Sequence, residues 1–345
     1  MQNGGMRAAT LSLLLFAVLT GCATTPSSSP TSASTEGFDP ELSTYAYPFT
    51  VRDFTFESQR QPLRMAYMDE RPAQWNGRTV LLLHGKNFGG YAWAETMRAL
   101  LERGYRVVAP DQVCFGKSTK PSSYQFSFAQ LATNTGALLD AIGVDRVSVV
   151  GHSMGGMLAT RFALMFPERT ERLVLVNPIG LEDYDDLVAW RSIDAWYQQE
   201  LRATPESIRE YQRQSYYAGE WKPEYEALIE AAAGWTKHPE YPRVAWCSAL
   251  TYDMIFTQPV VDDLPLVKTP TLLIIGQRDR TAVGRPWARK EIAATMGNYP
   301  ELGRKAAAAI PHATLKELEG VGHVPQVEAF DTYMQALAAF LDDRS

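Results

Sequence analysis

From residue 79 onwards, short and nearly uninterrupted apolar runs recur along the chain. They are Thr79–Leu83, Val147–Val150, Leu173–Val176 and Thr271–Ile275. Short runs that are rich in Val, Ile and Leu are typical of strands buried on both faces of a parallel sheet. We therefore predict a mostly parallel central sheet, with further strands at Tyr47–Phe56, Leu63–Met68, Arg106–Ala109 and Thr314–Leu318.

Several segments between these runs place apolar residues at the three- and four-residue spacing of a helix. Such spacing occurs in Trp93–Leu101, Phe128–Ile142 and Phe330–Leu341, and another helix is predicted after Ser153. Strands that alternate with helices build βαβ units, whose helices cover both faces of the sheet. The predicted fold class is therefore α/β.

The alternation stops over residues 178–263, which hold five of the eight tryptophans. Apolar spacing there is helical, as in Ser207–Gln214 and Pro223–Ala233. We predict a helical cap inserted between two core segments, 47–177 and 264–345. Most of its aromatic side chains should form the core of the cap itself, and the others should line an apolar acyl pocket.

Composition narrows the function classes. The formal net charge is −6, and the absence of a basic patch or a long run of like charges argues against a nucleic-acid partner. The histidines and cysteines do not have metal-ligand spacing, and there is no glycine-rich phosphate loop, so neither a metal nor a cofactor is expected. Besides Cys22, the chain has Cys114 and Cys247, and the sequence leaves open whether they pair.

The first 21 residues have the pattern of an export signal. Arg7 is their only charged residue, and the apolar stretch from Ala8 to Leu19 is short for a membrane span. Leu19-Thr20-Gly21-Cys22 resembles the lipobox of bacterial lipoproteins. This resemblance implies that residues 1–21 are removed and that Cys22 carries a lipid, which anchors the protein to a membrane of the bacterial cell envelope.

In this class of lipoproteins, Asp at the position after the lipidated cysteine is associated with retention in the inner membrane. This chain has Ala23 there, which favours the outer membrane. An ordinary cleaved signal with an incidental cysteine is the alternative. Residues 23–35 are only Ala, Thr, Ser and Pro, a composition that cannot bury enough apolar surface to fold. We predict a flexible tether over residues 22–46.

The most informative motif follows Val147–Val150 directly and reads Gly151-His152-Ser153-Met154-Gly155-Gly156. A serine between glycines at a strand-to-helix turn is the pattern of a nucleophile elbow. The tight turn strains the serine backbone and requires small residues two positions away on each side. It also exposes the hydroxyl beside the positive end of the next helix. Ser153 is therefore the predicted nucleophile.

Two further candidates follow other predicted strands: Asp279, after Gly276, and His323, after Gly322. Because active sites of open α/β sheets form at the carboxyl ends of strands, we expect both side chains to lie near Ser153. His323 is the predicted base and Asp279 the residue that orients it. Asp262 and Asp263 are the alternatives to Asp279.

These motifs together resemble the α/β-hydrolase superfamily, of the capped esterase, proline-iminopeptidase and haloalkane-dehalogenase-like kind. The resemblance covers about Tyr47–Leu341 and includes the chain order Ser, Asp, His. It rests on His84-Gly85, Asp111 through Gly116 to Ser118, Gly151 to Gly156, Gly276 to Asp279 and Gly322 to Pro325. Cys114 stands where the family pattern has glycine, and Lys86 where relatives often carry a neutral or acidic residue.

The resemblance also implies an oxyanion hole formed by the backbone N–H groups of Lys86 and Met154. His84 is expected to hold the oxyanion loop, His152 to act as a packing residue, and Asp111 to organise its own loop.

A serine nucleophile, in place of the aspartate of haloalkane dehalogenases and epoxide hydrolases of this fold, implies acyl-enzyme chemistry. The predicted function is a serine hydrolase that cleaves short- to medium-chain carboxylic esters of small molecules. The same triad leaves open an aminopeptidase or amidase, a C–C hydrolase and a cofactor-free haloperoxidase. An aminopeptidase needs an acidic group to hold the substrate amine, for which the candidates are Glu182, Asp183, Asp185 and Asp186. A non-catalytic, lipid-anchored binding protein is the alternative from a different class.

Overall fold

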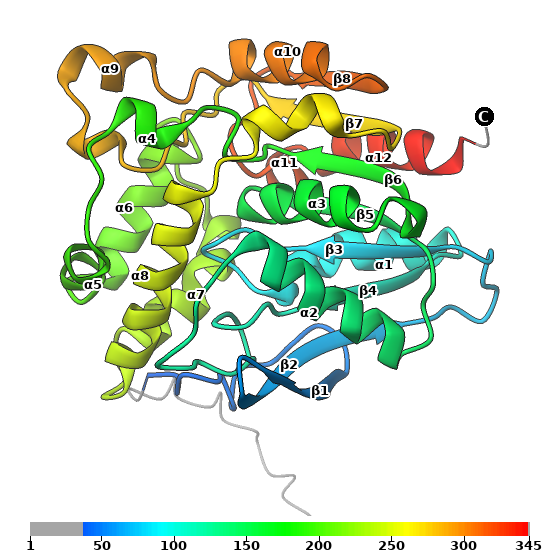
Figure 1. Ribbon diagram of the computed structural model, residues 1–345, viewed down its shortest axis with the longest axis horizontal. Coiled ribbons are helices and arrows are strands. Elements are labelled where there is room, and N and C mark those ends of the chain that lie inside the picture. Colours follow the sequence, from blue (N-terminus) through cyan, green and yellow to red (C-terminus); the bar gives the residue numbers. More distant parts are fainter. Residues whose placement is uncertain (1–36, 344–345) are drawn as a thin grey trace, which may run out of the picture. The chain divides into compact units, whose positions relative to one another are not determined.

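The computed structural model describes residues 37–343 and is built on a sheet of eight strands (Figure 1). The strands are β1 (Val51–Ser58), β2 (Gln61–Glu70), β3 (Thr79–Leu83), β4 (Arg106–Pro110), β5 (Val147–His152), β6 (Thr170–Val176), β7 (Thr271–Gly276) and β8 (Ala313–Leu318). Their order in the sheet is β1-β2-β4-β3-β5-β6-β7-β8. The pairs β1/β2 and β2/β4 are antiparallel, and all other neighbours are parallel. The prediction of a mostly parallel α/β sheet is therefore confirmed.

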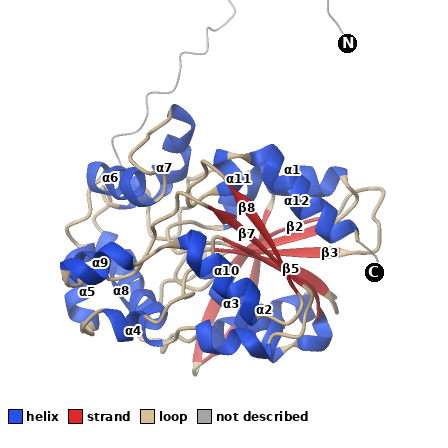
Figure 2. Cartoon of the chain, turned by 90° about the horizontal axis from the view of Figure 1, so that it is seen from above, coloured by secondary structure: helices blue, strands red, loops and turns tan. Residues whose placement is uncertain are grey.

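The helices of the core cover both faces of this sheet (Figure 2). They are α1 (Ala94–Glu102), α2 (Phe128–Ala141), α3 (Met154–Met165), α9 (Lys290–Thr295), α10 (Tyr299–Ala309), α11 (Pro325–Glu328) and α12 (Phe330–Asp342), with 3-10 turns at Gly90–Trp93, Pro167–Arg169 and Arg285–Trp287. The period of two along β3 explains the two layers. Leu81 belongs to the buried cluster that includes residues of α2, α3 and α10, whereas Val80 belongs to the cluster that includes residues of α1 and α12.

The insert between β6 and β7 is helical, as predicted. It contains α4 (Tyr184–Leu187), α5 (Ile193–Glu200), α6 (Pro205–Ser215), α7 (Glu226–Trp235) and α8 (Tyr241–Thr257), with 3-10 turns at Pro223–Tyr225 and Val261–Leu266. Helix α6 begins with a capping box, in which the Thr204 side chain accepts from Ser207 and the Ser207 side chain accepts from the Thr204 backbone. The pattern located α6 and α7 but missed α5 and the long helix α8.

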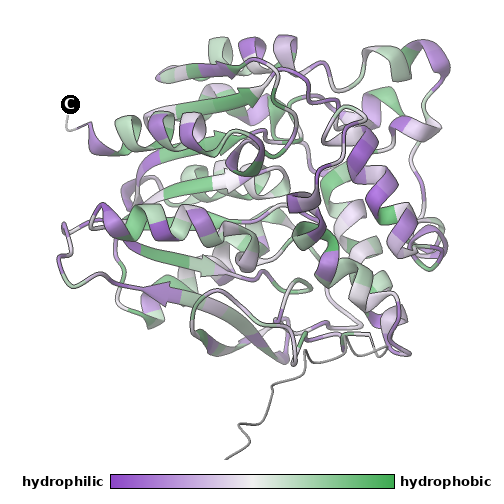
Figure 3. Cartoon of the chain, turned by 180° about the vertical axis from the view of Figure 1, so that it is seen from behind, coloured by the Kyte–Doolittle hydropathy of each residue, from purple (hydrophilic) through white to green (hydrophobic). Residues whose placement is uncertain are grey.

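Most of the cap aromatics pack against one another, as expected. Trp196 stacks on Tyr252 with ring centroids 4.5 Å apart, and Tyr217 stacks on Tyr225 at 3.8 Å. Trp190 is the exception, because 58% of it is exposed. Figure 3 shows apolar residues concentrated on the strands, while the cap helices alternate between polar and apolar positions.

The folded chain begins earlier than the predicted boundary at Tyr47. The Phe38 N–H donates to the Gly234 carbonyl of α7 (3.1 Å), the Trp235 indole donates to the Asp39 carbonyl (3.1 Å), and Leu42 is fully buried. Residues 37–46, which the pattern assigned to a flexible tether, therefore form an arm on the cap. The apolar residues of this segment, which pack with aromatic partners, stand among many polar residues. The sequence pattern therefore did not reveal them.

The predicted signal, the lipidation site Cys22 and the tether up to residue 36 lie outside the described residues. Within residues 37–343, no helix has the length and apolarity required to cross a membrane.

Candidate active site

Ser153 lies at a sharp turn between β5 and α3, with φ of 55° and ψ of −121°. This positive φ is rare for a residue with a side chain and is typical of functional sites. The flanking glycines leave no room for a Cβ atom. At Gly151 it would lie 2.1 Å from the Gly155 carbonyl oxygen, and at Gly155 it would lie 2.1 Å from the Leu83 carbonyl oxygen. The structure thus has the strained turn and the small neighbours that the motif predicted.

Asp279 and His323 meet at the carboxyl ends of β7 and β8. The His323 Nδ1 lies 2.6 Å from the Asp279 Oδ2, and both side chains are fully buried. Close packing of two glycines allows this contact, because a Cβ atom at Gly276 would lie 2.1 Å from the Gly322 carbonyl oxygen. Asp263, one of the alternatives to Asp279, instead forms an ion pair with Arg161.

The Asp279 carboxylate accepts two further hydrogen bonds, from the Asn177 amide (2.7 Å) and the Thr281 backbone N–H (2.8 Å). Asn177 in turn accepts from the Gly276 N–H (2.9 Å), so its amide links the ends of β6 and β7. These donors stabilise a buried anion and fix its orientation toward His323. Sequence reasoning missed Asn177, although it follows β6 directly and the rule on strand ends could have indicated it.

The second ring nitrogen of His323, Nε2, indicates which chemistry the site supports. Its Nε2 is buried and has no hydrogen-bond partner in the described part of the chain, including Ser153. Asp279 occupies Nδ1, so Nε2 is the nitrogen that remains to accept a proton. Catalytic hydrogen bonds are often long in unliganded enzymes and tighten when substrate binds.

The loop that carries His323 is held from several sides. The His323 N–H donates to the Tyr216 carbonyl of the cap (2.9 Å), and the two rings lie 4.4 Å apart. His152 bonds through Nε2 to the His323 carbonyl (2.8 Å), and burial lowers the pKa of His152 well below its ordinary value, which keeps that ring neutral. The Glu328 carboxylate accepts from the N–H groups of Gly322 and Val324. The cap therefore contributes directly to the position of the base.

The loop after β3 packs against Ser153. A Cβ atom at Gly85 would lie 3.1 Å from the Ser153 Cβ. His84 accepts from the Gln112 N–H through Nε2 (3.1 Å), so its Nδ1 donates to the Gly85 carbonyl (2.9 Å). Lys86 follows Gly85, and Met154 is the first residue of α3, where a backbone N–H has no intrahelical acceptor. The two predicted oxyanion donors thus belong to segments that adjoin Ser153.

Asp111 organises its loop, as predicted. Its carboxylate accepts from the N–H groups of Gly90 (2.6 Å) and Lys117 (2.7 Å) and from the Tyr47 hydroxyl (2.6 Å). These bonds use both carboxylate oxygens, so Asp111 serves the loop that precedes α2.

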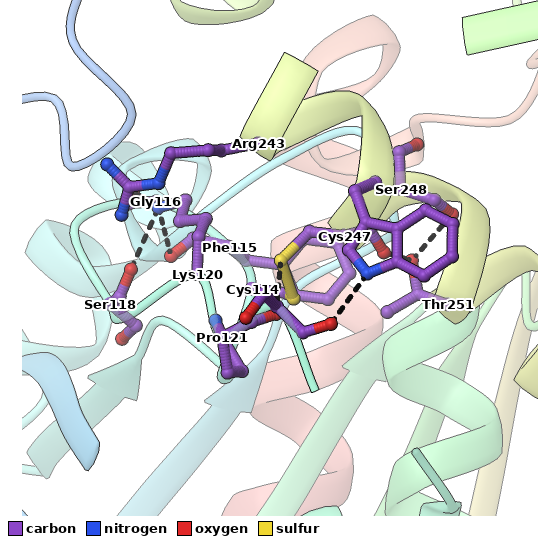
Figure 4. Close-up of a disulfide and its surroundings, with 12 residues drawn as sticks. Cys114, Phe115, Gly116, Ser118, Lys120, Pro121, Arg243, Cys247, Ser248 and Thr251 are labelled. Atoms are coloured by element: carbon purple, nitrogen blue, oxygen red, sulfur yellow. Dashed lines mark hydrogen bonds between the residues drawn. A yellow bond between two sulfur atoms is a disulfide. The ribbon is translucent and has the colours of Figure 1, made fainter. Parts of the chain in front are cut away.

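The same loop is linked covalently to the cap (Figure 4). Cys114 forms a disulfide with Cys247 of α8, and their Cα atoms lie 5.4 Å apart. Cys114 has a φ of 80°, which explains why the family pattern places glycine at this position. The pairing that the sequence left open is therefore present, and it joins core to cap.

A cavity of about 400 Å³ lies between this loop, the oxyanion loop and the cap. Its lining is mostly apolar, as predicted, with Phe115 and Trp235 in the wall, but it also includes Lys86, Glu200, Arg202 and Gln212. The acidic residues proposed to hold a substrate amine, Glu182, Asp183, Asp185 and Asp186, do not line it. None of these four carboxylates is thus placed to hold a substrate amine in this cavity, and Glu182 instead accepts from the Gly297 N–H.

Lys86 extends its side chain along the wall of this cavity. Its ammonium donates to the Ser248 hydroxyl (2.6 Å), which donates to the Glu200 carboxylate (2.6 Å), and it lies 3.6 Å from the centre of the Tyr252 ring. Burial lowers the pKa of Lys86 to about 8, and the charge of Glu200 partly opposes that shift. Gln212 is fully buried, and both of its amide atoms lack a partner within residues 37–343. Such an unsatisfied group costs about 1–3 kcal/mol unless something in the cavity binds it.

Within residues 37–343, no group of three or more His, Cys, Asp or Glu side chains is arranged to hold a metal ion.

Comparisons with known proteins agree with this fold. A probable hydrolytic enzyme from Pseudomonas aeruginosa PAO1 is similar in structure, with a TM-score of 0.88 and 52% identity over 90% of this chain and 99% of that one. A bacterial membrane phospholipase A is 25% identical, with a TM-score of 0.61, over 85% of this chain and 86% of that one.

Among curated proteins, the 2-hydroxy-6-oxo-2,4-heptadienoate hydrolase of Pseudomonas putida is 40% identical over 107 residues, which are 30% of this chain. The chain thus spans only 39% of that relative's length. The family model described as alpha/beta hydrolase fold matches residues 78–330, which is well over half of the sequence. The chain belongs to the α/β-hydrolase family.

Proposed function

We propose that this hydrolase cleaves carboxylic esters through an acyl-enzyme on Ser153. The observation that carries the proposal is the state of His323: Asp279 binds its Nδ1, while its buried Nε2 has no partner among the described residues and is free to accept a proton. A base of this kind beside a strained elbow serine is the arrangement that acyl transfer requires.

In the proposed reaction, Nε2 of His323 removes the Ser153 proton as Oγ attacks the ester carbonyl. The N–H groups of Lys86 and Met154 stabilise the oxyanion, each contribution being about 2.7–4 kcal/mol in enzymes of this kind. His323 then protonates the leaving alcohol, and Asp279 stabilises the transient imidazolium. Water, activated by the same base, releases the acid and restores Ser153.

The test is Ser153→Ala, assayed with p-nitrophenyl esters and a fluorophosphonate probe. Turnover should fall by about three orders of magnitude or more, and labelling of the native enzyme should map to Ser153. Ser148→Ala is the matched control, because Ser148 lies buried on β5, the strand that leads into Ser153, and its hydroxyl has no partner among residues 37–343. Undiminished hydrolysis in Ser153→Ala would reject the assignment.

A C–C hydrolase is the second candidate, favoured by the match to the heptadienoate hydrolase. It would use the same three residues on a carbon–carbon bond beside a ketone. Faster turnover of a vinylogous 1,5-diketone than of any ester in the panel would transfer the assignment to this reaction.

We also propose that the hydrolase is exported and lipid-anchored through Cys22, on the outer membrane. The buried disulfide supports export, because disulfides persist in oxidising compartments such as the periplasm. Cys22→Ser should release the protein from washed membranes while ester hydrolysis persists. Retention of the variant in the membrane fraction would reject this anchor.

A further inference from the structure

The cavity beside the oxyanion loop has an unusual balance of charge. Two cationic side chains line it, the partly buried Lys86 and the solvent-exposed Arg202, against the single carboxylate of Glu200. This excess of positive charge occurs in a chain whose formal net charge is −6. A low-dielectric cavity strengthens such local fields, so its wall favours an anionic group.

The Lys86 ammonium is incompletely satisfied. Of its three donors, one is used by the Ser248 hydroxyl and one side of the group faces the Tyr252 ring. Within the described residues, no carboxylate lies within 4.0 Å of its nitrogen, because Ser248 separates it from Glu200. One donor is thus left for a ligand.

Gln212 provides a second, independent indication. It comes from α6, on the cap side of the cavity, and neither its amide nitrogen nor its amide oxygen has a partner. A fully buried carboxamide without partners is rare in folded proteins and is expected where a ligand completes its hydrogen bonds.

The position of Lys86 sets the length of such a ligand. Its backbone N–H is a predicted oxyanion donor, and its side chain lines the cavity, so an acyl chain that extends from Ser153 into the cavity meets the ammonium about one lysine side chain away from the oxyanion donor. Only a short acyl chain joins these two points.

We propose, resting on the ester hydrolysis proposed above, that the substrates are monoesters of short dicarboxylic acids, whose free carboxylate is bound by the side chains of Lys86 and Gln212. Hydrolysis adds one water across the ester bond: the acyl C–O bond breaks, the alcohol leaves with a proton from His323, and the dicarboxylate departs. Lys86 and Gln212 determine specificity and do not take part in bond making.

The experiment compares two esters of equal shape. p-Nitrophenyl hemiglutarate carries the carboxylate, and p-nitrophenyl 5-methylhexanoate replaces it with an isopropyl group. The native enzyme should show a kcat/KM for the hemiglutarate about ten-fold higher or more. Gln212→Leu should lower that preference about five- to ten-fold, mainly through a higher KM for the hemiglutarate. Lys86→Met, which keeps the backbone N–H, should abolish the preference.

Glutarate binding to Ser153→Ala, measured by calorimetry, gives a readout independent of turnover. Binding should be detectable and should weaken about ten-fold or more when Lys86→Met is added. Hydrolysis of both esters without preference for the hemiglutarate would overturn the inference and leave the esterase standing. Glutarate binding without hydrolysis of either ester would overturn the proposed esterase activity and leave only the carboxylate-binding site standing.

Discussion

The α/β core and the cap differ in what holds their functional residues in place. In the core, Ser153, Asp279 and His323 all follow parallel strands, and backbone turns and close-packed glycines fix their positions. In the cap, side chains from α5, α6 and α8 enclose a cavity through aromatic stacking and a chain of polar contacts. The proposed catalytic residues are therefore positioned by backbone geometry, whereas the cavity is shaped by side-chain packing.

The two regions are nevertheless joined at a few points. The disulfide links the loop after β4 to α8, Lys86 reaches Ser248, and Tyr216 contacts His323. If the core positions the catalytic residues and the cap shapes the cavity, changes in the core should abolish turnover. Changes at these junctions should mainly alter stability or selectivity. The following predictions test that division in order of decreasing effect.

The largest effect is expected for Asp279→Asn. The amide can donate to Nδ1 and so favours the wrong tautomer of His323, which should lower kcat by about four orders of magnitude. Asp263→Asn is the matched control, because Asp263 pairs with Arg161 and should affect kcat little. Steady-state kinetics on both variants measures the difference. If Asp263→Asn causes the greater loss, the assignment of Asp279 is wrong.

Removal of the disulfide should act on stability. In the variant Cys114→Gly/Cys247→Ala, glycine adopts the positive φ of residue 114 without strain. Loss of the disulfide should lower the free energy of unfolding by about 2–4 kcal/mol. Urea unfolding of the native enzyme with and without dithiothreitol is the comparison, and the variant should not respond to the reductant. A native enzyme that is equally stable in both conditions would show that the link contributes nothing.

The core was far more predictable from the sequence than the cap. Each catalytic candidate follows a strand whose apolar run is visible locally, so the rule on strand ends sufficed for Ser153, Asp279 and His323. Cap packing depends on contacts between helices distant in sequence, which a pattern of apolar residues does not encode. The charged side chains in the cavity wall and the order of residues 37–46 were missed for this reason, and the pairing of Cys114 with Cys247 was left open.

Asn177→Ala should have an intermediate effect within the core. It removes a hydrogen bond to the Asp279 carboxylate and leaves the Gly276 N–H without its acceptor. Since hydrogen bonds to charged groups contribute about 1.5–3 kcal/mol, kcat should fall about ten- to hundred-fold with little change in KM. Thermal unfolding serves as the control for folding. A change confined to KM would mean that Asn177 acts on the substrate and not on Asp279.

The smallest effect is expected for Tyr216→Phe, which separates the ring of this cap residue from its hydroxyl. The ring packs on His323, while the hydroxyl accepts from the Asn87 amide (2.7 Å). Burial raises the pKa of Tyr216 well above its ordinary value, so the hydroxyl stays protonated and does not carry charge to the base. The variant should thus lower kcat less than about five-fold, the cost of one neutral hydrogen bond. Tyr216→Ala, which also removes the ring, should lower kcat further, because His323 would lose its support from the cap. Equal and large losses in both variants would instead assign the hydroxyl a role in the reaction, and the cap would then contribute to the chemistry as well as to the cavity and to the position of His323.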